Sequence, residues 1–211
     1  MKLFAKSVAA LVLVLTICLA GFFAYVSRPK TESSGDIARV AAVLRPLSDV
    51  TSLYRISSND SSAEFRIGHI VGSTNEIGGD IALTDSYLDL SSTTIDARSL
   101  STGNRLADNL MANFSLRTNQ PENAFIVFTP KYIGSPGTIA LGKPISFDLP
   151  GTLAIAGVSK PVIFHATLLK RKDFIIVTAT SSMERSDFGI WAPGLSDTVG
   201  LSVSLEAKKI N

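Results

Sequence analysis

Hydrophobic and polar residues alternate through much of the chain after residue 60. In the segment Val199–Lys208, every second residue from Val199 to Ala207 is apolar, and the residues between them are small or polar. A period of two is typical of a β-strand with one buried and one solvated face. The pattern therefore predicts a strand here, and similar runs recur from Ala63 onwards.

Eight such segments follow one another. The predicted strands are Ala63–Val71, Ile77–Leu83, Tyr87–Ala97, Ala124–Ile133, Ile145–Ile155, Pro161–Lys170, Phe174–Met183 and Val199–Lys208. Turn signals such as Gly78-Gly79, Gly157 and Pro193-Gly194 separate several of them. Eight strands with mostly short connections predict an all-β, eight-stranded antiparallel barrel, which side chains fill or which holds one small ligand. A two-sheet sandwich is the alternative.

The connection over residues 99–118 is much longer than the others. It contains apolar residues at helical spacing, namely Leu106, Leu110, Met111 and Phe114. A long connection in a compact domain is usually functional, and here it predicts a short helix across one mouth of the barrel. The helix is either a lid over a cavity or a plug that completes the core.

The beginning of the chain has a different character. Ser7–Val26 carries no charged residue and follows Lys2 and Lys6. As a helix with a rise of about 1.5 Å per residue, it would be about 30 Å long, the thickness of the hydrocarbon core of a bilayer. We expect residues 1–27 to be a signal anchor, a transmembrane segment that places residues 7–26 in a membrane. A signal peptide cut after Ala20, or a lipoprotein signal at Cys18, are alternatives, and all three export the domain.

Two further regions complete the organisation of the chain. Residues 28–53 are expected to be a linker with a short amphipathic helix, because apolar residues between Ile37 and Leu47 share one helical face. Residues 54–211 are expected to form the β-domain. The only cysteine of the chain, Cys18, lies in the apolar segment, so the exported part must be held together by its core rather than by disulfides.

Charge and chemistry narrow the functions that remain. The formal net charge of +2 gives no strong field for nucleic acid, so no nucleic-acid partner is expected. His69 and His165 have no neighbours at metal-ligand spacing, and no hydrolase motif is present. Gly137–Lys143 has phosphate-loop spacing, but Pro144 replaces the hydroxyl residue that would hold magnesium. We therefore expect no metal, no catalytic residues and no enzyme activity.

Four segments, in order, resemble the YceI-like family, which is described as lipid- or polyisoprenoid-binding. They are Ala63-Glu-Phe-Arg-Ile-Gly-His69, Ile95-Asp-Ala-Arg-Ser-Leu-Ser-Thr-Gly103, Gly151-Thr-Leu-Ala-Ile-Ala-Gly-Val-Ser-Lys-Pro-Val162 and Glu184-Arg-Ser-Asp-Phe-Gly-Ile190, and the last strand also fits. The resemblance spans roughly residues 54–210. It implies a lipocalin-like barrel in the periplasm, whose apolar tunnel takes an isoprenoid quinone, a polyprenyl lipid or another long-chain lipid, with no further cofactor.

Strand parity suggests which residues would line such a tunnel. The expected lining is Phe65, Ile67, His69, Phe128, Phe164, Leu201 and Val203 from the strands, with Leu106, Met111 and Phe114 from the helix. A register shift by one residue would reverse these faces. Each buried methylene contributes about 0.8 kcal/mol, so a prenyl tail needs no specific polar contact.

The expected function is that of a periplasmic lipid-binding protein tethered to the inner membrane. Two alternatives stay open: a structural or partner-binding module with a filled core, and an enzyme in which His69 works with Asp96 or Asp108. The sequence does not distinguish transport from storage or sensing. It also leaves the oligomeric state open, a homodimer included.

Overall fold

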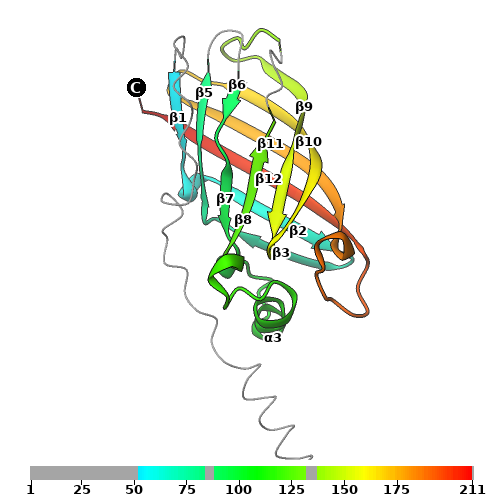
Figure 1. Cartoon of the computed structure of the whole chain (residues 1–211). Coiled ribbons are helices and arrows are strands. Elements are labelled where there is room, and N and C mark those ends of the chain that lie inside the picture. Colours follow the sequence, from blue (N-terminus) through cyan, green and yellow to red (C-terminus); the bar gives the residue numbers. More distant parts are fainter. Residues whose placement is uncertain (1–51, 84–87, 132–136, 211) are drawn as a thin grey trace, which may run out of the picture.

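A computed structural model describes residues 52–83, 88–131 and 137–210 (Figure 1). The predicted signal anchor and the predicted linker helix both lie outside these ranges. Within them, no helix is long and apolar enough to span a membrane.

The described residues fold mainly into β-strands, joined in one antiparallel sheet. The strands are β1 (Ser52–Ile56), β2 (Ser62–Ile67), β3 (Ile70–Thr74), β4 (Ile77–Gly78), β5 (Asp80–Leu83), β6 (Leu88–Leu90), β7 (Thr93–Asp96), β8 (Phe125–Pro130), β9 (Pro144–Ile155), β10 (Val158–Lys170), β11 (Phe174–Glu184) and β12 (Thr198–Lys209). One short α-helix, α3 (Arg105–Leu110), continues into the π-helical turn η3 (Met111–Ser115). Single 3₁₀ turns are η1 (Ser58–Asp60), η2 (Ala97–Ser99), η4 (Pro121–Asn123) and η5 (Arg185–Phe188).

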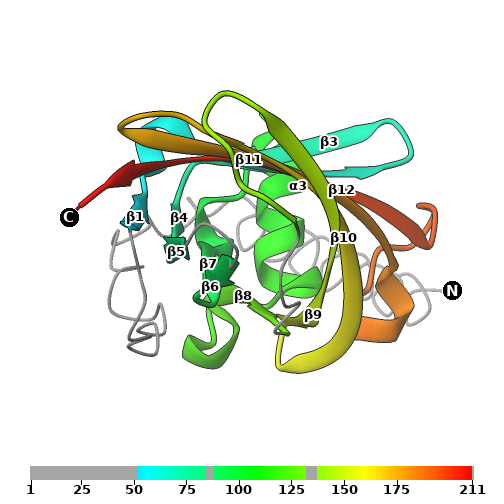
Figure 2. The same cartoon turned by 90° about the horizontal axis from the view of Figure 1, so that it is seen from above.

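The sheet curls strongly. Its pairing order runs from β4 through β7, β8, β9, β10, β11, β12, β1 and β5 to β6. Strands β4 and β7 lie at one end of this order, and β5 and β6 lie at the other. The chain joins these two ends twice, because only Gly79 separates β4 from β5 and only Ser91 and Ser92 separate β6 from β7. Seen from above, the strands surround an interior, and α3 lies across its far end (Figure 2).

The inner face of the curled sheet is apolar, as the alternation in the sequence predicts. Along β12, Val199, Leu205 and Ala207 are buried, whereas Ser204 and Lys208 are exposed. The largest core cluster gathers Tyr54, Ile81, Leu83, Leu168, Ile175, Val177, Leu205 and Ala207 from β1, β5, β10, β11 and β12. The predictions of a mostly-β antiparallel domain and of one short helix in the long connection are confirmed.

The start of the domain differs from the prediction in two ways. Strand β1 was not predicted, and the single predicted strand Ala63–Val71 is a hairpin in which Ile67 pairs with Ile70. Gly68 adopts a left-handed φ of 59°, which glycine reaches without a steric penalty, so the chain reverses within two residues. The apolar alternation continues through this turn and conceals it in the sequence.

The sheet also depends on close contact between the backbone and one aromatic ring. Gly151 in β9 lies directly over the ring of Phe128 in β8. A Cβ atom at position 151 would overlap two ring carbons and would lie 2.7 Å from the carbonyl oxygen of Thr129. Only glycine fits here, because one of these neighbours is backbone and cannot move alone.

We therefore expect Gly151→Ala to lower the free energy of unfolding by about 1–3 kcal/mol, the usual range for an overpacked site. Denaturant unfolding measures this change. Gly200→Ala is the matched control, since a Cβ there meets nothing nearer than 3.9 Å. Equal stability of the two variants would contradict the packing described for Gly151.

Candidate functional site: an apolar cavity beneath the helix

A cavity of about 380 Å³ lies between the α3–η3 helix and the end of the curled sheet. Apolar side chains supply almost all of its wall. They come from three parts of the chain: the sheet, the helix with the residues on either side of it, and the segment from η5 to β12. The lining is Phe65, Ile67, Ile70, Leu100, Thr102, Ala107, Leu110, Met111, Ser115, Leu116, Ile126, Ile155, Met183, Arg185, Ile190, Trp191, Ala192, Pro193, Leu195, Val199 and Leu201.

A second cavity of about 120 Å³ lies deeper inside the sheet. The two cavities adjoin, because Phe65, Leu100, Ile126, Ile155 and Leu201 line both. The inner one is bounded by Phe128 and Phe164, whose rings meet edge to face with centroids 5.0 Å apart. Ligand pockets usually measure about 300–1,000 Å³, so the larger cavity has the size of a binding site.

The structure brings most of the predicted lining residues together. Phe65, Ile67, Met111 and Leu201 line the larger cavity. Phe128, Phe164 and Val203 line the inner one, which Phe65 and Leu201 share.

Three predicted lining residues lie elsewhere. His69 is exposed in the β2–β3 turn, so its predicted inward orientation is wrong. Leu106 is 48% exposed, because the face of the α3–η3 helix turned to the cavity carries Ala107, Leu110 and Met111. Phe114 is half-buried and lies outside the lining, to which the π-helical turn contributes Met111 and Ser115 instead.

Hydrogen bonds to polar side chains fix the helix. The Asn104 side chain caps α3 by accepting hydrogen bonds from the backbone N–H groups of Leu106 and Ala107, at 3.0 and 3.2 Å. The buried Asp108 carboxylate accepts hydrogen bonds from the Ser101 hydroxyl (2.7 Å) and from the backbone N–H and hydroxyl of Thr102 (2.7 and 2.8 Å). The helix is therefore held to the segment that precedes it.

The other carboxylate considered for catalysis is also engaged. Asp96 is fully buried and accepts hydrogen bonds from the Arg98 guanidinium at 2.8 and 2.6 Å and from the Arg98 backbone N–H at 2.9 Å. This hydrogen bonding raises the pKa of Arg98. The guanidinium also lies over the ring of Phe125, 5.2 Å from its centre. Asp96 and Asp108 thus position loops, which leaves the His69-based enzyme hypothesis without support from the geometry.

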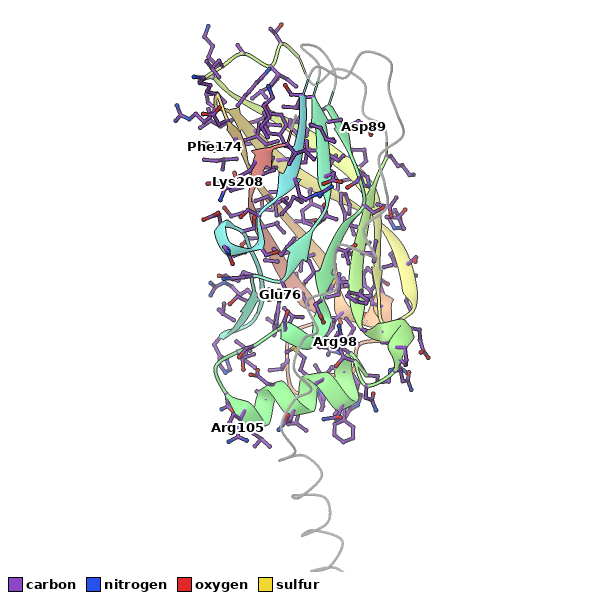
Figure 3. The ribbon with its side chains drawn as sticks, turned by 90° about the vertical axis from the view of Figure 1, so that its left-hand side faces the viewer. Glu76, Asp89, Arg98, Arg105, Phe174 and Lys208 are labelled. Carbon is purple, nitrogen blue, oxygen red and sulfur yellow. The ribbon has the colours of Figure 1, made fainter. Side chains whose placement is uncertain are left out.

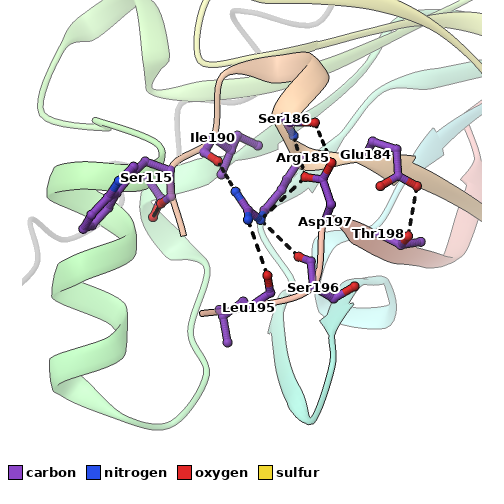
Figure 4. A network of polar contacts seen from close by, with 10 residues as sticks. Ser115, Glu184, Arg185, Ser186, Ile190, Leu195, Ser196, Asp197 and Thr198 are labelled. Carbon is purple, nitrogen blue, oxygen red and sulfur yellow. Dashed lines mark hydrogen bonds and ion pairs between the residues drawn. The ribbon is translucent and has the colours of Figure 1, made fainter. Parts of the chain in front are cut away.

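Arg185 holds the remaining wall in place (Figure 4). Its guanidinium donates hydrogen bonds to three backbone carbonyls, those of Ile190 (2.9 Å), Ser196 (3.0 Å) and Leu195 (3.4 Å). These bonds close the segment over residues 190–196 into a loop. The hydroxyl of Ser115 then donates to the carbonyl of Trp191 at 2.7 Å and ties the loop to the helix.

A carboxylate completes this network. Asp197 accepts hydrogen bonds from the hydroxyl and the backbone N–H of Ser186, at 2.6 and 3.0 Å, and lies 3.8 Å from Arg185. These hydrogen bonds and the nearby guanidinium lower the pKa of Asp197. The network had not been predicted, since backbone carbonyls are acceptors in every residue and leave no trace in the sequence. The apolar residues Phe188, Ile190, Trp191 and Leu195 between the last two strands were the available signal.

No cluster of three or more His, Cys, Asp or Glu side chains suited to a metal ion occurs in the described ranges. His165 lies on the outer face, where its Nδ1 is 2.7 Å from an Asp148 oxygen, and both side chains are exposed.

The fold and cavity define a class of small β-proteins in which a curled antiparallel sheet encloses an apolar cavity closed by a short helix. The chain belongs to the YceI-like family, whose profile matches residues 54–207. No curated protein matches it.

Solved structures share this fold. BcnA of Burkholderia cenocepacia has a TM-score of 0.63 at 14% identity, over 72% of this chain and 99% of its own. A polyisoprenoid-binding domain from Saccharophagus degradans, implicated in plant cell wall breakdown, has a TM-score of 0.59 at 16% identity, over 74% and 98%. The YceI protein of Campylobacter jejuni has a TM-score of 0.55 at 23% identity, over 69% and 88%.

Substitution of Arg185 by Gln should loosen the cavity wall. Charge-assisted hydrogen bonds contribute about 1.5–3 kcal/mol each, so we expect backbone amides over residues 190–197 to exchange at least tenfold faster. Hydrogen exchange followed by mass spectrometry measures this. Arg105→Gln, on the exposed surface of α3, is the control and should leave exchange unchanged. If Arg185→Gln leaves the exchange of residues 190–197 unchanged, Arg185 does not organise this wall.

Proposed function

We propose that this domain binds an isoprenoid or another long-chain lipid, with the tail inside the two adjoining cavities. The observation that carries the proposal is the apolar cavity of about 380 Å³, which continues toward the interior of the sheet. Trp191 lines this cavity and is 60% exposed, so the cavity reaches the surface. Further support comes from the Saccharophagus degradans relative, which is described as polyisoprenoid-binding.

In this proposal, the tail supplies the binding energy. The polar side chains of the larger cavity, Thr102, Ser115 and Arg185, already donate hydrogen bonds to other groups of the protein. Burial of each methylene contributes about 0.8 kcal/mol, so a few prenyl units suffice for micromolar affinity. Such a cavity selects tails by length and width more than by head group. The alternative of a module with a filled core would leave no space of this size.

The proposal extends to the finer architecture. Three groups of successive strands can each be counted as one interrupted strand, namely β1 with β2, β3 with β4 and β5, and β6 with β7. Counted in this way, the sheet is an eight-stranded lipocalin-like barrel. The domain then holds its ligand as a container and performs no chemistry on it. Asp96 and Asp108, which were the candidate acids, serve as hydrogen-bond acceptors for neighbouring loops.

We also propose that residues 7–26 anchor the protein in the inner membrane, with the domain in the periplasm. The support is the uncharged run Ser7–Val26 and the lysines that precede it. A tethered container would work on lipids close to that membrane.

Mass spectrometry of organic extracts from the purified full chain tests the ligand. We expect an isoprenoid or a long-chain lipid to be recovered at a reproducible ratio to protein. Repeated recovery of protein without any lipid, together with no binding of a short-chain isoprenoid quinone, would contradict the proposal.

Filling the cavity tests its location. Ala107→Phe places a ring in the larger cavity, and we expect the affinity for a short-chain isoprenoid quinone to fall about tenfold or more, because space for at least two methylenes is lost. Leu106→Phe is the matched control, since this neighbouring side chain is outside the lining. Equal affinities of the two variants would place the ligand elsewhere. Fluorescence titration measures both constants.

A further inference from the structure

Three segments far apart in the sequence meet at the end of the sheet opposite α3. Leu141 forms a β-bridge with Lys170, and the backbone N–H of Gly142 donates to the carbonyl of Lys170 at 2.9 Å. The backbone N–H of Lys209 donates to the carbonyl of Asp173, also at 2.9 Å. The turn between β10 and β11 is therefore flanked by residues 140–143 on one side and by the end of β12 on the other. We call these three segments the basic end.

The basic end carries a dense positive charge. Its cations are Lys143, Lys170, Arg171, Lys172, Lys208 and Lys209, and the only carboxylate within these three described segments is that of Asp173. Lys208 is neutralised by Asp60, whose carboxylate lies 2.6 Å from its ammonium group. Lys143, Arg171, Lys172 and Lys209 still give these three segments a net positive charge, although the whole chain has a formal net charge of only +2. Figure 3 shows Phe174 and Lys208 at this end and Arg105 of α3 at the other.

Exposed apolar side chains lie among these charges. Leu141 is 63% exposed and Ile210 is 46% exposed. A surface that combines Lys and Arg with protruding aliphatic side chains matches the interface of an anionic bilayer, where the cations meet head groups and the aliphatic groups enter the acyl boundary.

The chain also arrives at this end. Ser52 is the first described residue, and the backbone N–H of Ile210 donates to the carbonyl of the adjacent Leu53 at 2.9 Å. Whatever precedes residue 52 therefore joins the domain beside the basic end. A membrane anchor at residues 7–26 would keep this surface close to the bilayer at a high effective concentration.

We propose that the basic end docks on the surface of an anionic phospholipid membrane. This orientation of the domain rests on the proposed function, which makes the cavity with the exposed Trp191 the binding site. With the basic end on the membrane, that cavity points away from the membrane surface. Docking at the basic end keeps the domain upright on its anchor and leaves the cavity opening free for exchange of the ligand.

Fluorescence quenching by bromine-labelled phospholipids tests this arrangement. Trp191 is the only tryptophan of the chain and reports on the cavity end. The full chain with Leu141→Trp and Trp191→Phe reports on the basic end. In vesicles of phosphatidylglycerol and brominated phosphatidylcholine, we expect strong quenching at position 141 and none at Trp191. A saturating unlabelled isoprenoid alcohol fills the cavity beforehand, so that brominated acyl chains do not reach Trp191 from within it. Under this condition, quenching at Trp191, with or without quenching at position 141, overturns the proposal, and so does the absence of quenching at both positions.

A charge-neutralised variant tests the cause of docking. Each cation near an anionic surface contributes about 1 kcal/mol, so replacement of the exposed Lys143, Arg171 and Lys172 by Gln together should lower the ratio of docked to undocked domain about 100-fold. High salt should weaken docking as well. The matched control replaces Arg105, Arg117 and Lys131 by Gln, which removes the same charge from exposed sites elsewhere.

Equal loss of quenching in the two triple variants would show that total charge, rather than the basic end, governs binding, and would overturn the proposal. Isoprenoid binding is measured in the same preparations. A chain that binds the short-chain isoprenoid quinone but shows no quenching at position 141 fails in docking alone, whereas a chain that docks without binding the quinone fails in the proposed function alone.

Discussion

The apolar inner face of the curled sheet is the constraint on which this structure depends. An antiparallel sheet with one apolar face must remove that face from water, and here it does so by curling around it. Near the basic end, Tyr54, Leu168 and Ile175 fill the interior with their own side chains. Near α3 the interior stays open, because the helix and the loop over residues 190–196 lie across the end of the sheet rather than inside it.

Polar and apolar interactions have separate roles in the closure of that open end. Hydrogen bonds position the covering elements: Asp108 holds the helix, Arg185 closes the loop, and Ser115 joins the two. Apolar side chains alone face most of the cavity. A ligand therefore meets a wall whose shape is already fixed by hydrogen bonds within the protein, which lowers the entropy that binding would otherwise cost.

The sequence predicts the strands better than it predicts their ends. The period of two in Val199–Lys208 sets both the element and its buried face, and the same parity places Phe128 and Phe164 in the interior. It fails at Gly68, where a two-residue turn leaves the alternation intact and carries His69 out to solvent. The role of Arg185 was beyond prediction, because its partners are backbone carbonyls whose positions exist only after folding.

The central claim is that burial of an apolar tail, rather than recognition of a head group, drives binding to this domain. Calorimetric titration of the full chain with isoprenoid alcohols of increasing tail length and a constant head group tests it most directly. The account predicts that affinity rises steeply with each prenyl unit until the two cavities are full, with a negative heat-capacity change, and then levels off. An affinity independent of tail length would contradict it.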